Sequence, residues 1–273
     1  MNDPFAAHGL DHLSASQINE YIASPAKWLL RVSGFKDTTG SPAMWRGIAV
    51  DKAICKVLDD PETSDEAAHE IATVEFASRH AEALENQPFD DAKVYKEQLA
   101  VKGYLDLALP HYRLLGKPVE TQSRVTVDVG LSVPIIGYID VLYENAVRDI
   151  KTVGRLPKSV PSATARQLAI YAHAKNSTPI VDYVHFTKTT QQVVTMGVPD
   201  HKEHWKTAVQ AAKNMAKLLS VSSDIQEIAG LLMPDFDDWR WSDGEKDAAK
   251  RLWRLHDEER NDNSGASDGA CPF

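Results

Sequence analysis

Cysteine is nearly absent from this chain: Cys55 and Cys271 are the two among 273 residues. Two cysteines exclude a disulfide framework, a four-cysteine zinc site and a four-cysteine iron–sulfur cluster. Long hydrophobic runs are missing too, because no stretch approaches the ~18 uninterrupted apolar residues of a membrane helix. The first five residues lack the basic start and apolar run of a secretory signal. The sequence therefore predicts a soluble protein of a reducing, cytoplasmic compartment with no membrane partner.

Positive charge is in the minority. Thirty Lys and Arg against 39 Asp and Glu give a formal net charge of -9. This balance argues weakly against a histone-like positive coat, although it leaves room for a local basic cleft. Hydrophobic residues at 43% and charged residues at 25% are ordinary globular values, which exclude fibrous, collagenous and fully disordered classes.

Serine residues mark the expected starts of the first helices. Ser14 and Gln17 have the Ser-x-x-Gln spacing of a capping box. Ser24 and Ser41 each precede a proline, which is typical of an N-cap followed by the first helical position. Further helices are expected over 43–58, 64–84, 90–115, 202–219, 223–232 and 243–256.

The hydrophobic period changes to two in the middle of the chain. Alternation over 119–129 predicts a half-buried strand. One face of this strand would carry Val119, Thr121, Ser123, Val125 and Val127, and the other Glu120, Gln122, Arg124, Thr126 and Asp128. The remaining expected strands are 133–143, 146–153, 179–187 and 191–198, with a helix from 162 or 164 to 175 in between.

This order of elements predicts an α/β fold with a mixed central β-sheet flanked by helices. We expect one domain over 1–256, made of a helical part (13–115), a sheet core (118–198) and C-terminal helices (200–256). Residues 257–273 are polar and acidic, so they are expected to form a disordered tail.

Three charged residues are expected to meet at one end of the sheet. Asp140 ends an apolar strand, and a hairpin between 133–143 and 146–153 would bring Asp149 near it. Asp149 and Lys151 are two residues apart on one strand, so their side chains share a face. Two carboxylates suit Mg²⁺, and a lysine beside the metal can orient or help deprotonate an attacking water. From spacing alone, a solvated salt bridge is the slightly favoured explanation.

Gln167 and Tyr171 are four residues apart on the following helix and so lie on one face. An amide and a phenol at this place can hold a phosphate, or the lysine and its water. The alternative is a helix-capping glutamine and a half-buried tyrosine, which are common anywhere.

A local excess of positive charge surrounds these residues. Between Asn145 and Gln191 seven basic residues stand against two acidic ones, a local charge of +5. Such an island suits a phosphodiester substrate; the alternative is a solvated basic face. The seven are Arg148, Lys151, Arg155, Lys158, Arg166, Lys175 and Lys188.

Taken in order, these residues resemble a known family. GYID (137–140), DIKT (149–152) and QLAIY (167–171) are similar to the G-x-x-D, D-x-K-T and Q-x-x-x-Y motifs of the PD-(D/E)xK nuclease superfamily, and in particular of its RecB-like branch, which includes phage exonucleases. The N-terminal segments LSASQI (13–18), SPAKW (24–28) and RGIAVDKA (46–53) resemble the opening helices of that branch. Each motif is loose, but their common order from Leu13 to Tyr171 is fairly specific.

The resemblance implies a restriction-endonuclease-like core, DNA as substrate and Mg²⁺ or Mn²⁺ as cofactor. It assigns Asp140, Asp149 and the carbonyl of Ile150 to metal binding and Lys151 to catalysis. Gln167 and Tyr171 join the site, and Glu120 is a weaker candidate for an outer metal contact.

Two departures from the family pattern change these expectations. The metal-ligating histidine of the second helix is Asp51 here, which we keep as an expected metal ligand. Ser24 stands where cluster-bearing members have a cysteine, and Cys271 is alone near the C-terminus. No iron–sulfur cluster is therefore expected.

The sequence thus predicts a metal-dependent DNA nuclease, an exonuclease of replication, recombination or repair from a phage or bacterium. The alternative is a catalytically silent member that binds DNA or a protein partner. Trp205, Trp239, Trp241 and Trp253 could stack bases, although packing against the sheet is favoured. The acidic tail could bind a protein partner, because its last residues resemble the tip of bacterial single-strand-binding proteins, but chance explains so short a match better.

Overall fold

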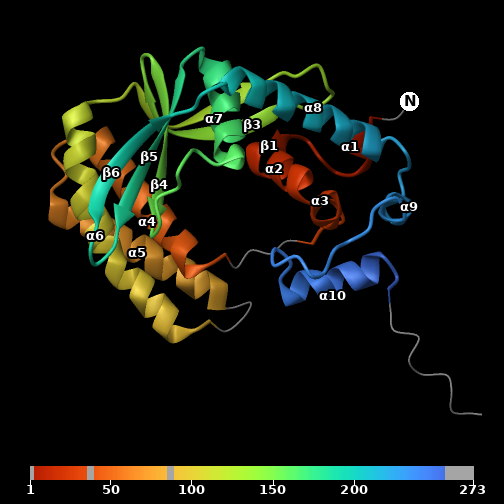
Figure 1. Cartoon of the computed structure of the whole chain (residues 1–273), viewed down its shortest axis with the longest axis horizontal. Helices are drawn as coiled ribbons and strands as arrows, with labels where there is room; N and C mark the ends of the chain where they lie inside the picture. Colours follow the sequence, from red (N-terminus) through yellow and green to blue (C-terminus); the bar gives the residue numbers. More distant parts are fainter. Residues whose placement is uncertain (1–2, 36–39, 85–88, 256–273) are drawn as a thin grey trace, which may run out of the picture.

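The computed structural model describes residues 3–35, 40–84 and 89–255. In this part of the chain a mixed β-sheet lies between two groups of helices (Figure 1), which confirms the predicted α/β fold. None of the described helices is long and apolar enough to span a membrane. The predicted tail, 257–273, and the last residue of the helix expected over 243–256 lie outside the described residues.

The elements follow the predicted order. The helices are α1 (Pro4–Ala7), α2 (Ala15–Ala23), α3 (Pro25–Val32), α4 (Pro42–Asp59), α5 (Asp65–Leu84), α6 (Asp91–Leu115), α7 (Ser162–Lys175), α8 (His201–Leu219), α9 (Ile225–Ala229) and α10 (Asp243–Leu252). The strands are β1 (Leu13–Ser14), β2 (Glu120–Val127), β3 (Ile135–Tyr143), β4 (Ala146–Val153), β5 (Thr178–Phe186) and β6 (Gln191–Gly197).

The serine caps form as expected. Ser24 and Ser41 accept hydrogen bonds from the third backbone N–H of α3 and α4, and a proline follows each. Ser14 likewise accepts from the Gln17 N–H at 3.2 Å. The reciprocal half of that capping box is absent in the described structure, since the buried Gln17 Oε1 has no hydrogen-bond partner. Each cap satisfies a backbone donor that the helix itself leaves free.

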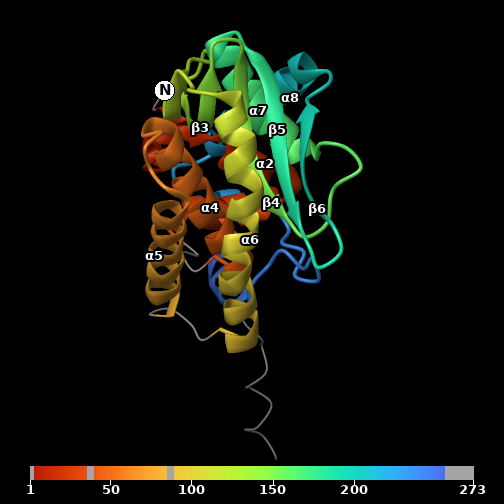
Figure 2. The same cartoon turned by 90° about the vertical axis from the view of Figure 1, so that its left-hand side faces the viewer.

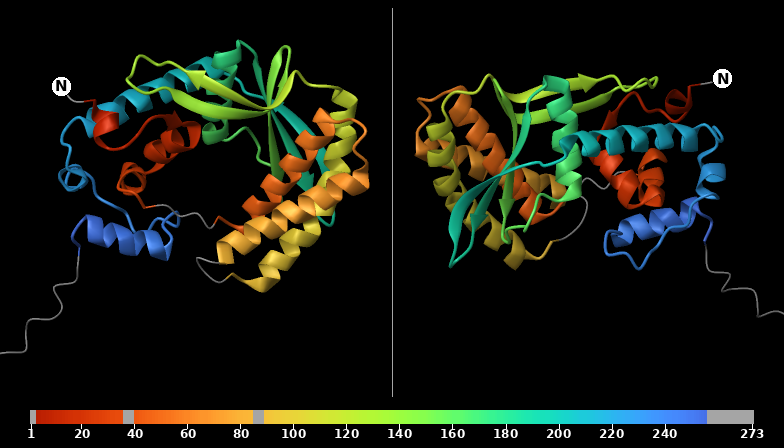
Figure 3. Two further views of the ribbon diagram at one scale, coloured as in Figure 1. Left: turned by 180° about the vertical axis from the view of Figure 1, so that it is seen from behind. Right: turned by 45° about the horizontal axis from the view of Figure 1, so that its top comes forward.

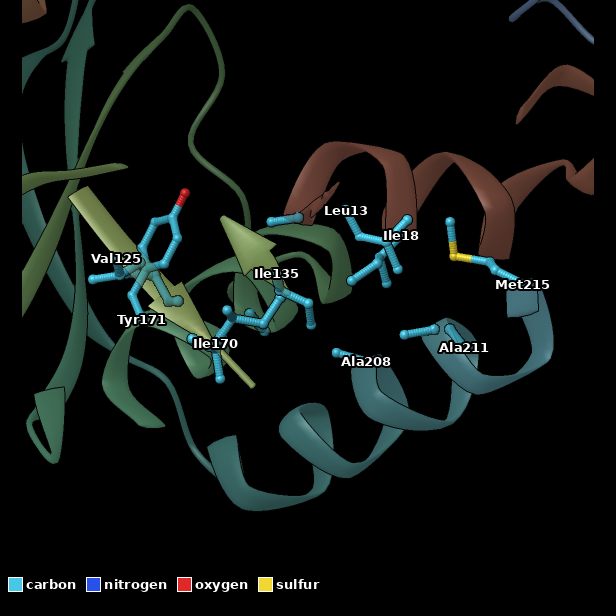
Figure 4. Packing of buried hydrophobic residues seen from close by; sticks show 14 of the residues in the cluster. Leu13, Ile18, Val125, Ile135, Ile170, Tyr171, Ala208, Ala211 and Met215 are labelled. Carbon is cyan, nitrogen blue, oxygen red and sulfur yellow. The ribbon is translucent and has the colours of Figure 1, made fainter. Parts of the chain in front are cut away.

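Two hydrophobic clusters cover the two faces of the sheet. Helices α7, α8, α1 and α2 pack on one face, and α4, α5 and α6 form a layer on the other (Figures 2 and 3). Figure 4 shows the first cluster, in which Ile135 and Ile170 meet Leu13, Ile18 and the α8 side chains. Helices thus cover both faces over most of the sheet, as in a layered α/β core.

Strand β3 is the centre of the sheet's pairing. β2 pairs antiparallel along one edge of β3, from Ile135 to Leu142. The other edge is shared: β1 pairs parallel at Ile135–Ile136, and β4 pairs antiparallel at Val141–Tyr143. The edge of β3 over 137–140 therefore has no strand partner in the described structure. The two-residue strand β1 was not predicted, because its residues also serve as the start of α2.

The predicted alternation of β2 is wrong at Gln122. This residue has a left-handed backbone, φ 47°, which is uncommon outside glycine, asparagine and aspartate. The kink turns Thr121 and Gln122 to the same side, where they bond Asp59 and Asp51 of α4. Ser123 is fully buried and bonds Glu120 instead. A local backbone inversion of this kind leaves no trace in a hydrophobic pattern.

A buried ionic network ties α6 to the sheet. The Asp182 carboxylate on β5 accepts hydrogen bonds from Arg148 at 2.7 and 2.8 Å, from Tyr112 at 3.0 Å and from Thr195 at 2.6 Å. Burial alone would raise the pKa of Asp182, but hydrogen bonds from His111, Thr195 and Arg148 lower the pKa to about 2. The ionised carboxylate is therefore the form that the folded protein stabilises.

We expect Asp182→Ala to lower the free energy of unfolding by about 3 kcal/mol at pH 7, because the largely buried Arg148 loses its counter-charge. Asp106→Ala is the control, since Asp106 is an exposed acid paired with Lys102 and should cost about 1 kcal/mol or less. Urea unfolding measures both. Equal losses in the two variants would contradict the network's role. Wild-type protein should lose the Asp182 contribution as the pH falls from 4 towards 2.

Candidate active site

The predicted site residues lie where β3 and β4 separate. Cross-strand pairing ends at Val141 and Arg148, so Asp140 and Asp149 are the next residues on the two diverging strands. The Ile150 N–H donates to the Asp140 carboxylate at 2.8 Å. The Asp140 side chain thus accepts the hydrogen bond that the Ile150 N–H would otherwise donate to the backbone of β3. The opening leaves room for side chains from both helical layers.

Asp149, Lys151, Gln167 and Tyr171 form one hydrogen-bonded chain. The Lys151 ammonium lies 2.9 and 2.8 Å from the two Asp149 carboxylate oxygens. The Gln167 amide donates to Asp149 at 3.2 Å and lies 3.4 Å from the Tyr171 hydroxyl. Asp149 is buried, with 1% of its surface exposed. The solvated salt bridge that spacing allowed is therefore excluded.

Gly137 makes room for Tyr171. A Cβ at position 137 would lie 2.4 Å from Tyr171 Cε1, closer than any two carbon atoms pack. The ring consequently lies against the β3 backbone, and its hydroxyl points away from the labelled aliphatic side chains (Figure 4). Burial raises the pKa of Tyr171 above its usual value. The glycine of GYID is thus required by packing.

Asp51 has two partners that the sequence did not suggest. The Gln122 amide donates to Asp51 Oδ2 at 2.8 Å, and the Cys55 thiol lies 3.5 Å from Oδ1. The thiol also lies 3.6 Å from the Asp140 carbonyl, so it links α4 to β3. Burial raises the pKa of Cys55 above its usual value. Gln122 was missed because its orientation depends on the left-handed backbone.

Burial and neighbouring charges raise the pKa of each of the three aspartates. Burial, followed by repulsion from Asp149 and Asp51, raises the pKa of Asp140 well above its usual value. Burial and repulsion from Asp149 likewise raise the pKa of Asp51 to about 6, and burial raises that of Asp149. Burial alone would lower the pKa of Lys151, but Asp149 and Asp140 raise it. Lys151 therefore carries a full positive charge at neutral pH.

Asp51, Asp140 and Asp149, the three aspartates expected to bind metal, do not form one cluster of ligands in the described structure. Among the described residues, no group of three or more His, Cys, Asp or Glu side chains is placed to hold a metal ion. Each carboxylate turns to a different donor, namely Gln122, the Ile150 N–H or Lys151, because like charges repel.

Arg46 supports the end of β4 from the α4 side. Its guanidinium donates to the Thr152 carbonyl at 3.2 Å, forms an ion pair with Glu97 of α6, and lies 4.3 Å from the centre of the Tyr104 ring. Only 6% of Arg46 is exposed. The residue that follows Lys151 is thus clamped by two helices, a role that the sequence motif did not reveal.

The predicted basic island is smaller than its composition suggested. Arg148 is bound to Asp182, Lys151 to Asp149, and Arg166 donates to Asn19 at 2.7 Å. Of the seven basic residues, Arg155, Lys158 and Lys188 remain exposed. Glu120 accepts a hydrogen bond from Ser123 at 2.5 Å, and its proposed outer metal contact stays a prediction.

Three of the four C-terminal tryptophans pack inside the protein, but Trp241 packs between α3 and α10 and not, as expected, against the sheet. Trp241 is buried, Trp253 donates to the Leu232 carbonyl at 2.8 Å, and Trp205 stacks on His173 with ring centres 3.9 Å apart. Trp239 is 87% exposed.

Comparison with known protein families identifies a superfamily for most of the chain. Residues 12–242 match the family model of the PD-(D/E)XK nuclease superfamily. The chain belongs to the PD-(D/E)XK nuclease superfamily. Its fold is consistent with the restriction-endonuclease-like core of that superfamily.

Other comparisons add little. No curated protein matches the chain. Among solved structures, the crystal structure of SSO0001 is similar at 19% sequence identity, with 68% of this chain and 94% of that one covered and a TM-score of 0.32. A TM-score this low carries no argument.

Superfamily members typically use divalent metals, and part of this site fits such an ion. Asp149 Oδ2 is buried and has an ion-pair contact with Lys151 but no hydrogen-bond partner. Asp140 lies beside it with only one oxygen engaged by the Ile150 N–H. Mg²⁺ takes one or two protein carboxylates and fills its other positions with water and phosphate oxygens. The donor set therefore suits a site centred on Asp140 and Asp149 better than one that needs all three aspartates.

Gly137→Ala should lower the free energy of unfolding by about 1–3 kcal/mol, because the new methyl group collides with the buried Tyr171 ring. Gly154→Ala is the matched control, since a Cβ there meets nothing within 4 Å. Urea unfolding of both variants tests this; a Gly137→Ala protein as stable as Gly154→Ala would contradict the close approach.

Asp51 should make the metal-free protein less stable as the pH rises. Its folded-state pKa of about 6 lies above the usual value of 3.8, so the folded protein binds this proton more tightly than the unfolded chain. Stability present at pH 4 is therefore lost on the way to pH 7, by up to about 3 kcal/mol. Asp51→Asn should reduce the dependence of the free energy of unfolding on pH, measured in EDTA. Identical pH profiles for the two proteins would show that Asp51 has an ordinary pKa.

Proposed function

We propose that this protein is a Mg²⁺- or Mn²⁺-dependent deoxyribonuclease of the RecB-like branch, without an iron–sulfur cluster. We further propose that it acts as an exonuclease in DNA replication, recombination or repair, in the cytoplasm of a bacterium or in a phage-infected cell. The hydrogen-bonded chain from Lys151 through Asp149 and Gln167 to Tyr171, next to Asp140 at an open strand edge, is the observation that supports it.

In this proposal Asp140, Asp149 and the Ile150 carbonyl hold the metal, and Asp51 assists from α4. The metal would polarise the scissile phosphate and stabilise the charge that develops on it. Lys151 keeps its proton, so it orients the attacking water and neutralises developing charge, and does not act as a general base. The Gln167 amide orients the Asp149 carboxylate for metal binding, and the Tyr171 hydroxyl accepts a hydrogen bond from the same amide.

Lys151→Ala should reduce cleavage at least a hundredfold, because the attacking water loses its positioning cation. Asp140→Asn should abolish cleavage, because a neutral amide is a much poorer ligand of Mg²⁺ than a carboxylate. Lys213→Ala removes the same charge from an exposed lysine of α8, outside the site and the basic island, and this variant should cleave normally. End-labelled linear and circular DNA, single- and double-stranded, with Mg²⁺, Mn²⁺ or EDTA, measures activity and end dependence.

Thermal unfolding with Mn²⁺ gives a second readout. Wild-type protein should gain about 2.7 kcal/mol at a hundredfold excess over the dissociation constant, and Asp140→Asn should gain much less. Wild-type protein that cuts in no metal and is not stabilised by Mn²⁺ would favour the catalytically silent DNA- or protein-binding alternative. Full activity in Lys151→Ala would place the active site elsewhere.

A further inference from the structure

An exposed aromatic and an exposed cation lie side by side on the sheet next to the aspartates. Tyr138 of β3 is 53% exposed, although its neighbours Gly137 and Ile139 are buried. Arg124 of β2 is exposed and is the cross-strand partner of Tyr138. Cross-strand partners have Cβ atoms about 5 Å apart, so the two side chains can contact one ligand.

Both side chains keep their polar or charged group unpaired within the described part of the chain. In the described ranges, Arg124 has no ion pair or side-chain hydrogen bond, and the Tyr138 ring has no aromatic or cationic partner. Most other arginines of the sheet region are bound, as Arg46, Arg148 and Arg166 show. A guanidinium and a phenol ring without such partners, side by side, are both available to contact a ligand.

Their position places them one step from the proposed metal site. Tyr138 and Asp140 are two residues apart on β3, so they share a face and lie about 7 Å apart along the strand. On β2, Gln122 bonds Asp51 of α4, and Arg124 follows two residues later. Beyond Gln122 the cover by α4 ends, because Arg124, Thr126 and Asp128 are all exposed. The open face therefore begins at the aspartates and runs past Tyr138.

We infer that Tyr138 and Arg124 form a subsite for the nucleotide next to the scissile phosphate. The Tyr138 ring stacks on an unpaired base, and the Arg124 guanidinium binds the neighbouring phosphate. Aromatic rings stack on any base, and guanidinium matches the geometry of phosphate oxygens. The subsite rests on the proposed nuclease function. It adds that the substrate is single-stranded where it crosses Tyr138 and Arg124.

The test uses the full chain with Lys151→Ala, which prevents cleavage during binding. Fluorescence anisotropy measures binding of a labelled twelve-nucleotide oligothymidine and of a blunt duplex in Mg²⁺. Adding Tyr138→Ala should weaken single-strand binding about tenfold, and Tyr138→Phe should not. Adding Arg124→Ala should weaken binding. It should also reduce by about 1 the slope of the logarithm of the binding constant against the logarithm of the salt concentration. Tyr95→Ala is the matched control, since Tyr95 of α6 is 63% exposed.

An abasic substitution walked along the oligonucleotide locates the stacked base. When the missing base is the one that stacks on Tyr138, the Tyr138→Ala protein and its parent should bind the oligonucleotide with equal affinity. When another base is missing, the Tyr138→Ala protein should still bind more weakly than its parent. A Tyr138→Ala protein that binds the single strand as its parent does would overturn the subsite. Equal weakening on single strand and blunt duplex would overturn stacking on an unpaired base.

The subsite and the nuclease function fail in distinguishable ways. If wild-type protein cuts DNA and Tyr138→Ala binds and cuts like it, the subsite is wrong and the nuclease stands. If wild-type protein cuts nothing but Tyr138→Ala still loses single-strand binding, the subsite stands in a DNA-binding protein. If wild-type protein cuts no DNA and neither it nor the Lys151→Ala protein binds DNA, both are wrong.

Discussion

The hydrogen bond from the Ile150 N–H to the Asp140 carboxylate is the contact around which the rest of the site is built. It occupies the place where a backbone ladder between β3 and β4 would continue, and so holds the strands apart without leaving a buried donor unpaired. The unpaired edge of β3 over 137–140 follows from this separation. The side chains of α4 and of α7, which lie on opposite faces of the sheet, reach the aspartates through that opening.

Opening a sheet at its centre concentrates charge in a poorly solvated place. Asp140, Asp149 and Asp51 repel one another, and burial makes the ionised forms costly. Lys151 offsets part of this cost, and Gln122 and Gln167 supply neutral donors that lower it further. A divalent cation bound between Asp140 and Asp149 would complete the compensation. Binding of such a cation would therefore stabilise the folded protein.

The opened strands are kept rigid by contacts outside the site. Arg46 fixes the Thr152 end of β4 to α4 and α6, and Asp182 fixes Arg148 to β5 and α6. Tyr171 lies against Gly137 and fixes α7 to β3. These three anchors leave one face of β2 and β3 uncovered beyond Gln122, and that face continues directly from the aspartates. The anchored strands and the uncovered face thus come from the same division of the sheet.

Local sequence signals determined much of this protein. Ser14, Ser24 and Ser41 cap helices where their spacing indicated, because capping depends on the next three residues alone. The change of period from helix to strand predicted the mixed sheet, and Asp149 and Lys151 share a face because strand side chains alternate. Only the tertiary structure decided the orientation of Gln122, the partners of Asp51, the burial of Arg148 and Arg46, and the pairing of β1. Each of these depends on residues more than 30 positions away or on a backbone inversion, and neither is encoded in the periodicity of a local segment.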